Sequence, residues 1–480
     1  MHMHADYLIR KDRDRSFDQY GRLGPFIFNY EATELFTQID HADKSIILYG
    51  KVIDSRNAAL TPREIAADLL AAENMTELLA YSRYLAGRYV ILFRVKEELW
   101  VLPDATSSVP VYYTVTGHET VVASSQKRIA DVLGFELSAS AVKIKASAEE
   151  QQSLPYDSAM YDEMKAVIPN HYLNVNEQRA VRHFPSYKMQ EKTVEEVALE
   201  TIHLTQNVVD NYMAERELII PLTAGKDSRL VLSFFRKYQD RIKLYTFNHH
   251  PESPEPDDIR IPKQLTEKLG LTYRVFPREQ LEESDYKHYQ TMFSGTQNKR
   301  ILENALTLKK SEYRDQSFVT GDIIPLVKSN FGRKLPEKLA TPSYLVTKTH
   351  NYSKENKARI TEWLNEVKGS AHENQVSLYD LFFWEMRLGR WLPNNMANYD
   401  TMSDPVLIFN NRHLIESWSA IPRAKRVDTA IHEMIIAKQW PELLDISLTS
   451  GGGLANALTQ QSYVYYLATF LKYGVHKFKK

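Results

Sequence analysis

The chain of 480 residues is longer than one hydrophobic core usually supports, so we expect two or perhaps three domains. Hydrophobic residues at 43% and charged residues at 25% are typical of a soluble globular protein, and a formal net charge of -1 argues against a surface built mainly for nucleic acid or anionic membrane. The absence of cysteine excludes disulfides, thiolate metal sites and thiol catalysis.

The first part of the chain has the pattern of short strands. Alternating or β-rich runs at 44–52, 89–93, 99–102 and 111–115 are separated by turn-prone charged residues, which predicts a layered β-rich domain over residues 1–190. Thr193 and Glu196 then form a capping box ahead of apolar residues at helical spacing. We therefore expect a long helix to open a second domain over residues 191–480.

From residue 218 short apolar runs alternate with helical segments. Strands are expected at 218–222, 243–247 and 272–276, with helices starting at Arg229 and covering 258–269, which predicts a parallel sheet with right-handed crossovers. Residues 317–320 indicate another strand. The rest of the chain is predicted as mostly helical, with 378–391 and 429–440 as the clearest helices.

Three glycines at 451–453 predict a flexible break before the carboxyl-terminal tail. The tail, residues 463–480, mixes aromatic and apolar residues with lysines, and a docked amphipathic helix is favoured over a helix lying on a membrane. No segment approaches the roughly 20 apolar residues of a membrane span, and the charged first 20 residues lack the core of a signal peptide, so we expect a cytoplasmic protein.

Residues 222–228 form a small-residue turn between a predicted strand and a predicted helix. Such a turn directs backbone N–H groups and a helix dipole at one point, which suits phosphate or pyrophosphate. The hydroxyls of Thr223 and Ser228 add donors, and Lys226 adds a positive charge. Asp227 would repel a bare phosphate, so we expect it to face a Mg²⁺ that bridges phosphate oxygens. The expected binding residues of the turn are Leu222, Thr223, Ala224, Gly225 and Ser228.

The sequence TAGKDS at 223–228 resembles the SGGxDS loop of the N-type ATP pyrophosphatases, and its continuation is similar to the asparagine synthetase and β-lactam synthetase family. The resemblance continues through residues 245–248, 253–258, 269–270, 319–322 and 405–409. It implies that the strand end with Phe247 holds adenine and that Thr320 and Gly321 contact the pyrophosphate. Residues 85–89, 110–113, 123–125 and 168–172 are similar to the family's glutaminase-like sandwich.

The resemblance implies an α/β protein with a β-rich Ntn-hydrolase-like sandwich at the amino terminus, followed by a parallel-sheet synthetase domain with a helical extension. Without cysteine, the degenerate glutaminase-like domain cannot open glutamine by thiolate attack. A second departure is Asp322, which follows Gly321 immediately, whereas the family has an acidic pair several residues farther on. Asp322 replaces either the family's metal aspartate or its neighbouring glutamate, and both assignments stay open.

Lys226, Asp227 and Asp322 are therefore the candidate catalytic residues, with Asp227 and Asp322 as the metal ligands. The lysine that neutralises developing charge in this family would fall near Asp428 or Thr429, so Lys425 and Lys438 are the candidate substitutes. Asp258 is interpreted first as a helix N-cap, and His249 and His250 as solvated loop residues rather than metal ligands. For the group Glu385, Arg387, Arg390 and Trp391, surface ion pairs are favoured over a place at the carboxyl end of the sheet.

These residues predict an ATP-dependent ligase or cyclase that uses Mg²⁺, adenylates a substrate carboxylate and lets an amine displace AMP, without glutamine hydrolysis. The expected partners are small-molecule or peptide carboxylates and amines, with no nucleic acid, and a homodimer is left open. A second enzyme hypothesis is adenylation of an amide or nucleobase carbonyl. The alternative from another class is a nucleotide-binding regulatory or scaffold protein that has lost catalysis.

Overall fold

The computed structural model describes most of the chain, including the whole turn at 222–228. The described residues are 6–115, 117, 119–142, 154–249, 255–333, 335–349, 353–426, 429–446, 463–464, 466–467 and 470. The predictions for His250, Ser253, Pro254, Asp428 and the glycines at 451–453 fall outside them. Within these ranges no helix is long and apolar enough to cross a membrane.

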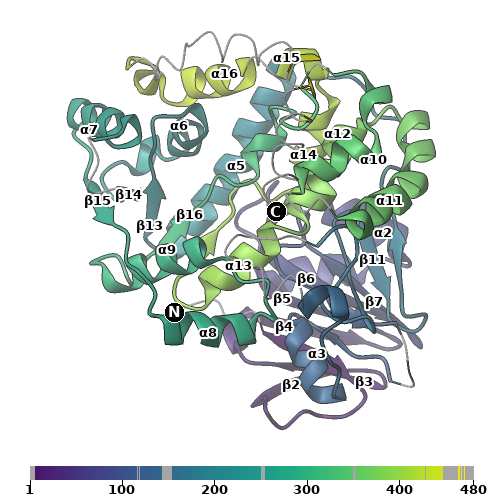
Figure 1. Cartoon of the computed structure of the whole chain (residues 1–480). Coiled ribbons are helices and arrows are strands. Elements are labelled where there is room, and N and C mark those ends of the chain that lie inside the picture. The colour runs from purple at the N-terminus through teal and green to yellow at the C-terminus, as the bar shows by residue number, and fades with distance from the viewer. Residues whose placement is uncertain are drawn as a thin grey trace.

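Two six-stranded antiparallel sheets form the amino-terminal part of the molecule, in purple and blue in Figure 1. The first has the order β10-β8-β9-β1-β3-β2, with strands Met164–Ala166, Tyr112–Thr114, Val122–Ala123, Tyr7–Arg10, Phe26–Tyr30 and Gln19–Leu23. The second has the order β12-β11-β7-β6-β5-β4, with strands Arg179–Arg182, His171–Asn174, Glu98–Pro103, Leu85–Val95, Lys44–Asp54 and Phe36–His41. All four strands predicted in this region are present, although β8 is one residue shorter at each end.

The alternation along β5 distributes its side chains between two cores. Ile47 and Tyr49 pack between the two sheets, whereas Ile46 and Leu48 pack on the opposite face, because successive residues of a strand point to opposite sides. Helices α1 (Pro62–Leu70) and α2 (Met75–Ser82) cover that outer face, and α3 (Gln126–Leu133) covers the outer face of the first sheet. The layers therefore follow the order helix, sheet, sheet, helix.

A five-stranded parallel sheet forms the second part of the molecule, as the alternating pattern predicts. Its order is β15-β14-β13-β16-β17, with strands Tyr273–Pro277, Lys243–Asn248, Leu218–Pro221, Ser317–Val319 and Pro405–Val406. The preceding helix α5 (Val194–Glu215) begins at the predicted capping box of Thr193 and Glu196. Because β13 pairs in parallel with both β14 and β16, the carboxyl ends of these three strands share one edge of the sheet.

Helices surround this sheet, with α16 drawn above α6 in Figure 1. Their bounds are Lys226–Ser233 (α6), Asp257–Leu269 (α7), Glu283–Met292 (α8), Lys299–Lys310 (α9), Pro342–Leu345 (α10), Lys354–Glu373 (α11), Leu378–Phe382 (α12), Leu392–Asp400 (α13), Arg412–Ala420 (α14), Arg423–Arg426 (α15) and Ala430–Gln439 (α16). In the tail, the rings of Tyr466 and Phe470 lie 4.9 and 6.2 Å from the ring of Tyr344, which agrees with a docked segment.

The helix predicted at 378–391 is present only in part, because it is not one continuous α-helix. Helix α12 passes into a π-helical segment, Phe383–Leu388, and a new helix, α13, begins at Leu392. Gly389 stands at this interruption, and a Cβ added there would collide with the ring of Pro169 from the amino-terminal part. The chain changes its helical geometry where it packs closely against the antiparallel layers.

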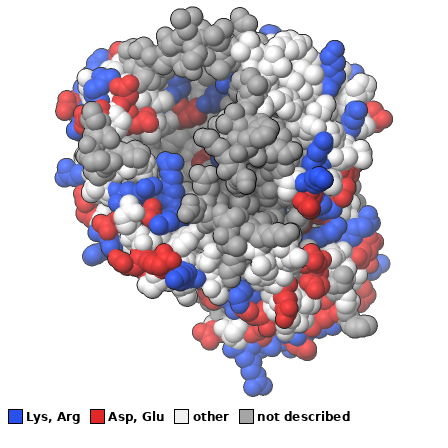
Figure 2. Space-filling model, in the orientation of Figure 1, with Lys and Arg blue, Asp and Glu red and all other residues white. Residues whose placement is uncertain are grey.

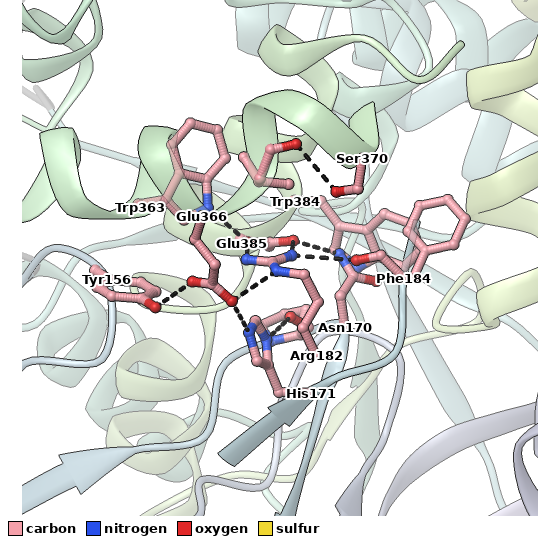
Figure 3. A network of polar contacts seen from close by, with 12 residues as sticks. Tyr156, Asn170, His171, Arg182, Phe184, Trp363, Glu366, Ser370, Trp384 and Glu385 are labelled. Atoms are coloured by element: carbon pink, nitrogen blue, oxygen red, sulfur yellow. Dashed lines mark hydrogen bonds and ion pairs between the residues drawn. The ribbon is translucent and has the colours of Figure 1, made fainter. Parts of the chain in front are cut away.

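Figure 3 shows a network of polar side chains that joins the two parts of the molecule. Arg182, on β12, donates to both carboxylate oxygens of Glu385, at 2.6 and 3.0 Å, and to Oε1 of Glu366 on α11 at 2.9 Å. The indole N–H of Trp363 and the amide of Asn170 also donate to Glu385, at 2.6 and 2.8 Å. Glu385 is completely buried, so the interpretation of this segment as surface ion pairs is wrong.

Candidate functional site

The turn at 222–228 lies at the carboxyl end of the central strand β13 and leads directly into α6. The Thr223 N–H donates to Oγ of Ser228 at 3.0 Å, and that hydroxyl lies 3.1 Å from both the carbonyl oxygen and the hydroxyl of Thr223. These contacts close the turn, so α6 begins at Lys226 and not at Arg229 as expected. Lys226, Asp227 and Ser228 consequently occupy the first helical turn, where backbone N–H groups lack intrahelical partners.

Strand β14 is tied to the same turn. The Leu222 N–H donates to the carbonyl of Tyr245 at 2.9 Å, and the Thr246 hydroxyl donates to the carbonyl of Leu222. The side chain of Leu222 is fully buried, so it can offer a ligand only its backbone. Phe247 is partly buried at the end of β14, with its ring 5.2 Å from that of Tyr245, and it remains a candidate for the adenine side of the site.

Asp258 contacts the turn instead of capping its own helix. Helix α7 begins at Asp257 with Pro256 at the N-cap, which corrects the interpretation of Asp258 as a cap. Its Oδ1 accepts the backbone N–H of Ala224 at 3.1 Å. One of the amides expected to bind phosphate is therefore already bound to a carboxylate.

Lys226 points towards the carboxyl-terminal helix α16. Its Nζ donates to the hydroxyl of Thr429 at 2.8 Å and pairs with the carboxylate of Glu433. Both residues lie at or near the start of α16, close to where the family resemblance places a lysine. The two lysines expected as substitutes are elsewhere: Lys425 is exposed, and Lys438 lies 3.7 Å from Glu195.

Asp227 is bound by two residues that the sequence did not single out. The ammonium of Lys328 donates to its two carboxylate oxygens at 2.9 and 2.7 Å, and Nε2 of His432 lies 3.2 Å from Oδ1, without good hydrogen-bond alignment. Burial alone would raise the pKa of Asp227, but His432 and the charge of Lys328 outweigh it and lower this pKa to about 2. The carboxyl group is therefore ionised throughout the neutral range.

Thr320, Gly321 and Asp322 follow β16, which pairs with β13. The Thr320 hydroxyl donates to Oδ2 of Asp322 at 2.6 Å. Burial raises the pKa of Asp322, while the Thr320 hydrogen bond and the charge of Arg387 oppose this rise. A Cβ on Gly321 would lie 3.4 Å from Val231 of α6, an ordinary contact distance, so the end of β16 lies beside the helix that carries Asp227.

Arg387 is the member of its predicted group that lies near the candidate site. Burial lowers the pKa of Arg387 to about 10, although the negative charge of Asp322 acts to raise it. The guanidinium stacks on Trp391, 3.6 Å from the centroid of its ring. Arg390 instead donates to the carbonyls of Leu154 and Ser158. His249, on the β14 side, lies 3.2 Å from the guanidinium of Arg300 through its Nε2.

The described residues contain no group of three or more His, Cys, Asp and Glu side chains arranged to hold a metal ion. A Mg²⁺ here would depend on one or two carboxylates with phosphate and water oxygens, as is usual for this ion. That Asp227 and Asp322 share a Mg²⁺ stays a prediction. What the structure brings together at Asp227 is a lysine and a histidine.

A cavity of about 640 Å³ lies away from the turn, between the amino-terminal sheets and helices α8 and α13, and none of the predicted site residues lines it. Its charged side chains are largely paired with one another, as in the buried pair Arg88–Asp400 at 2.7 Å. On the face drawn in Figure 2, blue basic and red acidic side chains are interspersed. This cavity does not add to the site at the turn.

No protein family model and no curated protein sequence matches the chain. Among the solved structures that are similar to the chain, three share 12% identity with it. The glutamine phosphoribosylpyrophosphate amidotransferase of B. subtilis, complexed with ADP and GMP, covers 65% of this chain and 64% of its own, with a TM-score of 0.24. A structure described as the allosteric regulatory enzyme of purine biosynthesis covers 54% and 52%, with a TM-score of 0.23.

The third is the glutamine-dependent NAD⁺ synthetase of Acinetobacter baumannii in complex with ADP, which covers 53% of this chain and 62% of its own at a TM-score of 0.20. The chain thus spans between about half and two thirds of the length of these structures. Scores this low carry no argument about activity. The function proposed below therefore rests on the residues of this chain.

Proposed function

We propose that the turn at 222–228 binds the phosphates of ATP and that the protein is an ATP-dependent, AMP-forming carbon–nitrogen ligase or cyclase. The observation that supports this most is the position of the turn. It joins the central strand of a parallel sheet to a helix N-terminus, at the edge where β14 and β16 also end. Open parallel sheets bind ligands at this edge, and helix N-termini favour phosphate.

In the proposed reaction a carboxylate oxygen of the substrate attacks the α-phosphorus of ATP, and pyrophosphate leaves with the electrons of the broken P–O bond. An amine then attacks the acyl carbon, loses a proton and displaces AMP. The enzyme acts mainly by positioning and by neutralising charge. Thr223, Gly225 and Ser228 are proposed at the phosphates, Phe247 on the adenine side, and Thr320 with Gly321 on the other side of the turn.

Residues 1–190 form the proposed glutaminase-like domain and residues 191–480 the synthetase domain. Because the chain has no cysteine, the nitrogen comes from an amine substrate and not from glutamine opened by a thiolate. The substrates are small-molecule or peptide carboxylates and amines, and a cytoplasmic location fits this chemistry.

The second candidate is a nucleotide-binding regulatory or scaffold protein without catalysis. It is favoured by the occupied groups at the turn, since the Ala224 amide already binds Asp258 and Lys226 already pairs with Glu433. A ligand that needs both groups must displace both carboxylates. A catalytic site and a binding site therefore differ in whether ATP is consumed once it is bound.

The test is a screen for pyrophosphate and AMP release against amino acids, peptides and sugar acids, run beside ATP calorimetry. The ligase is supported if a carboxylate and amine pair yields AMP and an amide, and if Ser228→Ala removes most of that release. Ser233→Ala is the matched control, because its hydroxyl binds the Leu230 carbonyl on the same helix, at the end away from the turn. ATP binding without AMP formation by any pair would favour the regulatory protein.

A further inference from the structure

The positive charge nearest to the carboxylate of Asp227 belongs to Lys328, which lies beyond β16. Its ammonium spans both carboxylate oxygens, at 2.9 and 2.7 Å. The two side chains are 27% and 33% exposed, so the pair is open to a ligand that enters at the turn. Asp227 itself is the second residue of α6, directly after the turn proposed to bind phosphates.

The ammonium of Lys328 occupies the position at Asp227 that a divalent metal ion would need. A Mg²⁺ bound to Asp227 would stand in front of the carboxylate, where the ammonium contacts both oxygens. A Mg²⁺ and the Lys328 ammonium in contact with the same carboxylate would repel each other strongly in a partly buried site. The other predicted ligand, Asp322, already accepts the hydroxyl of Thr320 through its Oδ2, at 2.6 Å.

The position of Lys328 is fixed by buried contacts on both sides of it. The carboxylate of Asp380, 3% exposed, accepts the hydroxyl of Ser329 at 2.8 Å and pairs with Arg426. The guanidinium of Arg426, which is fully buried, donates in turn to the carbonyl of Leu326 at 3.3 Å. The buried pair of Arg426 and Asp380 thus holds both Leu326 and Ser329, on either side of Lys328. The backbone of the lysine therefore has little freedom to move.

We propose that Lys328 supplies the cation that faces the pyrophosphate part of the nucleotide, in the place where a divalent metal ion would bind Asp227. Asp227 then acts as a positioning residue that directs the ammonium towards the turn. The inference rests on the proposed function, because it assumes that the turn binds ATP. It replaces the expectation that Asp227 and Asp322 share Mg²⁺.

The experiment is calorimetry of ATP and AMP binding, each with EDTA and with Mg²⁺. For the unchanged protein we expect ATP to bind in EDTA within about threefold of its affinity in Mg²⁺, and more tightly than AMP. Lys328→Gln should lower the affinity for ATP in EDTA by roughly tenfold or more, because a charge-assisted contact to phosphate is lost, and should leave AMP binding nearly unchanged. In this variant Mg²⁺ should restore part of the lost affinity.

Two variants serve as controls. Lys328→Arg keeps the charge and should retain most of the binding in EDTA, even if Lys328→Gln proves unstable. Lys237→Gln removes a lysine that pairs with Asp210 at 2.5 Å beyond the far end of α6, and it should change nothing. Binding of ATP by the unchanged protein only with Mg²⁺, or an unaltered affinity of Lys328→Gln in EDTA, overturns the inference and leaves nucleotide binding intact. Absence of ATP binding under every condition overturns both.

Discussion

The buried carboxylate of Glu385 offers the sharpest test of how the two parts of the molecule are held together. We expect Glu385→Gln to lower the free energy of unfolding by about 3–5 kcal/mol, the usual cost of breaking a buried ion pair from one side. The substitution keeps the shape but removes the negative charge and one of the two acceptors that the guanidinium of Arg182 contacts at 2.6 and 3.0 Å, so one of its N–H groups then faces an amide N–H. Trp363 and Asn170 donate to different oxygens of Glu385, so in the variant one of them keeps a weaker, neutral acceptor and the other faces the amide N–H.

The assay is urea unfolding followed both by far-ultraviolet circular dichroism and by tryptophan fluorescence, to which Trp363 contributes from within the network. Coincident transitions are needed before a single free energy is extracted. Glu366→Gln is the matched control: its carboxylate also accepts from Arg182, at 2.9 Å, but it is 33% exposed, so a loss of about 1 kcal/mol or less is expected.

A double variant separates the charge from the packing. Arg182→Met with Glu385→Gln removes both charges of the buried pair, and its cost should be smaller than that of Glu385→Gln alone, because no buried guanidinium is left facing an amide. Equal losses for Glu385→Gln and Glu366→Gln would refute the reasoning, since burial would then make no difference to the value of the pair.

Three further outcomes are expected. Asp227→Asn should reduce pyrophosphate release on the order of a hundredfold with unchanged circular dichroism, because Lys328 loses the carboxylate that positions it; near-normal release would contradict this role. Burial and the charges of Arg412, His171 and Arg182 hold the pKa of His183 well below its usual value. The unfolded chain takes up this proton near pH 6.5 and the folded chain does not, so stability should fall as the pH drops below about 6.5, by up to about 1.4 kcal/mol per unit, and His183→Gln should flatten the slope in urea titrations. Glutamine should not serve as the nitrogen donor, because the chain has no cysteine to open its amide; stoichiometric release of glutamate with product would contradict this prediction.

The parts of the fold that were predictable are those encoded within a few residues. The strands at 44–52 and 243–247 are apolar runs bounded by turn residues, and α5 begins at the capping box of Thr193 and Glu196. The start of α6 was missed because Gly225, its N-cap, has no side chain to signal a cap, and Ser228 closes the turn from inside the helix. At the break, Gly389 packs against Pro169, more than two hundred residues away, and no local pattern reveals this contact.

The same distinction separates the predictable and unpredictable parts of the site. The turn was found because its residues are contiguous, whereas Lys328 and His432 reach Asp227 from other segments. A weak signal for His432 existed, since it is a polar residue on the apolar face of α16 that also carries Ile431, Ile435 and Ile436. Without a contact map this pattern equally suits a histidine that only fills the core.

The charges around the turn fall into two groups with different energetic roles. The first group is the buried ion pair of Arg426 and Asp380, called the buried frame because it holds the segment around Lys328. The two side chains are 0% and 3% exposed, and breaking such a pair is costly. The contacts at the turn are more open: Glu433 is 53% exposed where it meets Lys226, and pairs of this kind are worth about 0–1 kcal/mol. A polyphosphate with several negative charges can therefore displace Glu433 from Lys226 at small cost, while Lys328 stays where the buried frame holds it. The occupied state of the turn is thus compatible with binding, because the groups that must be exchanged are the weakly held ones.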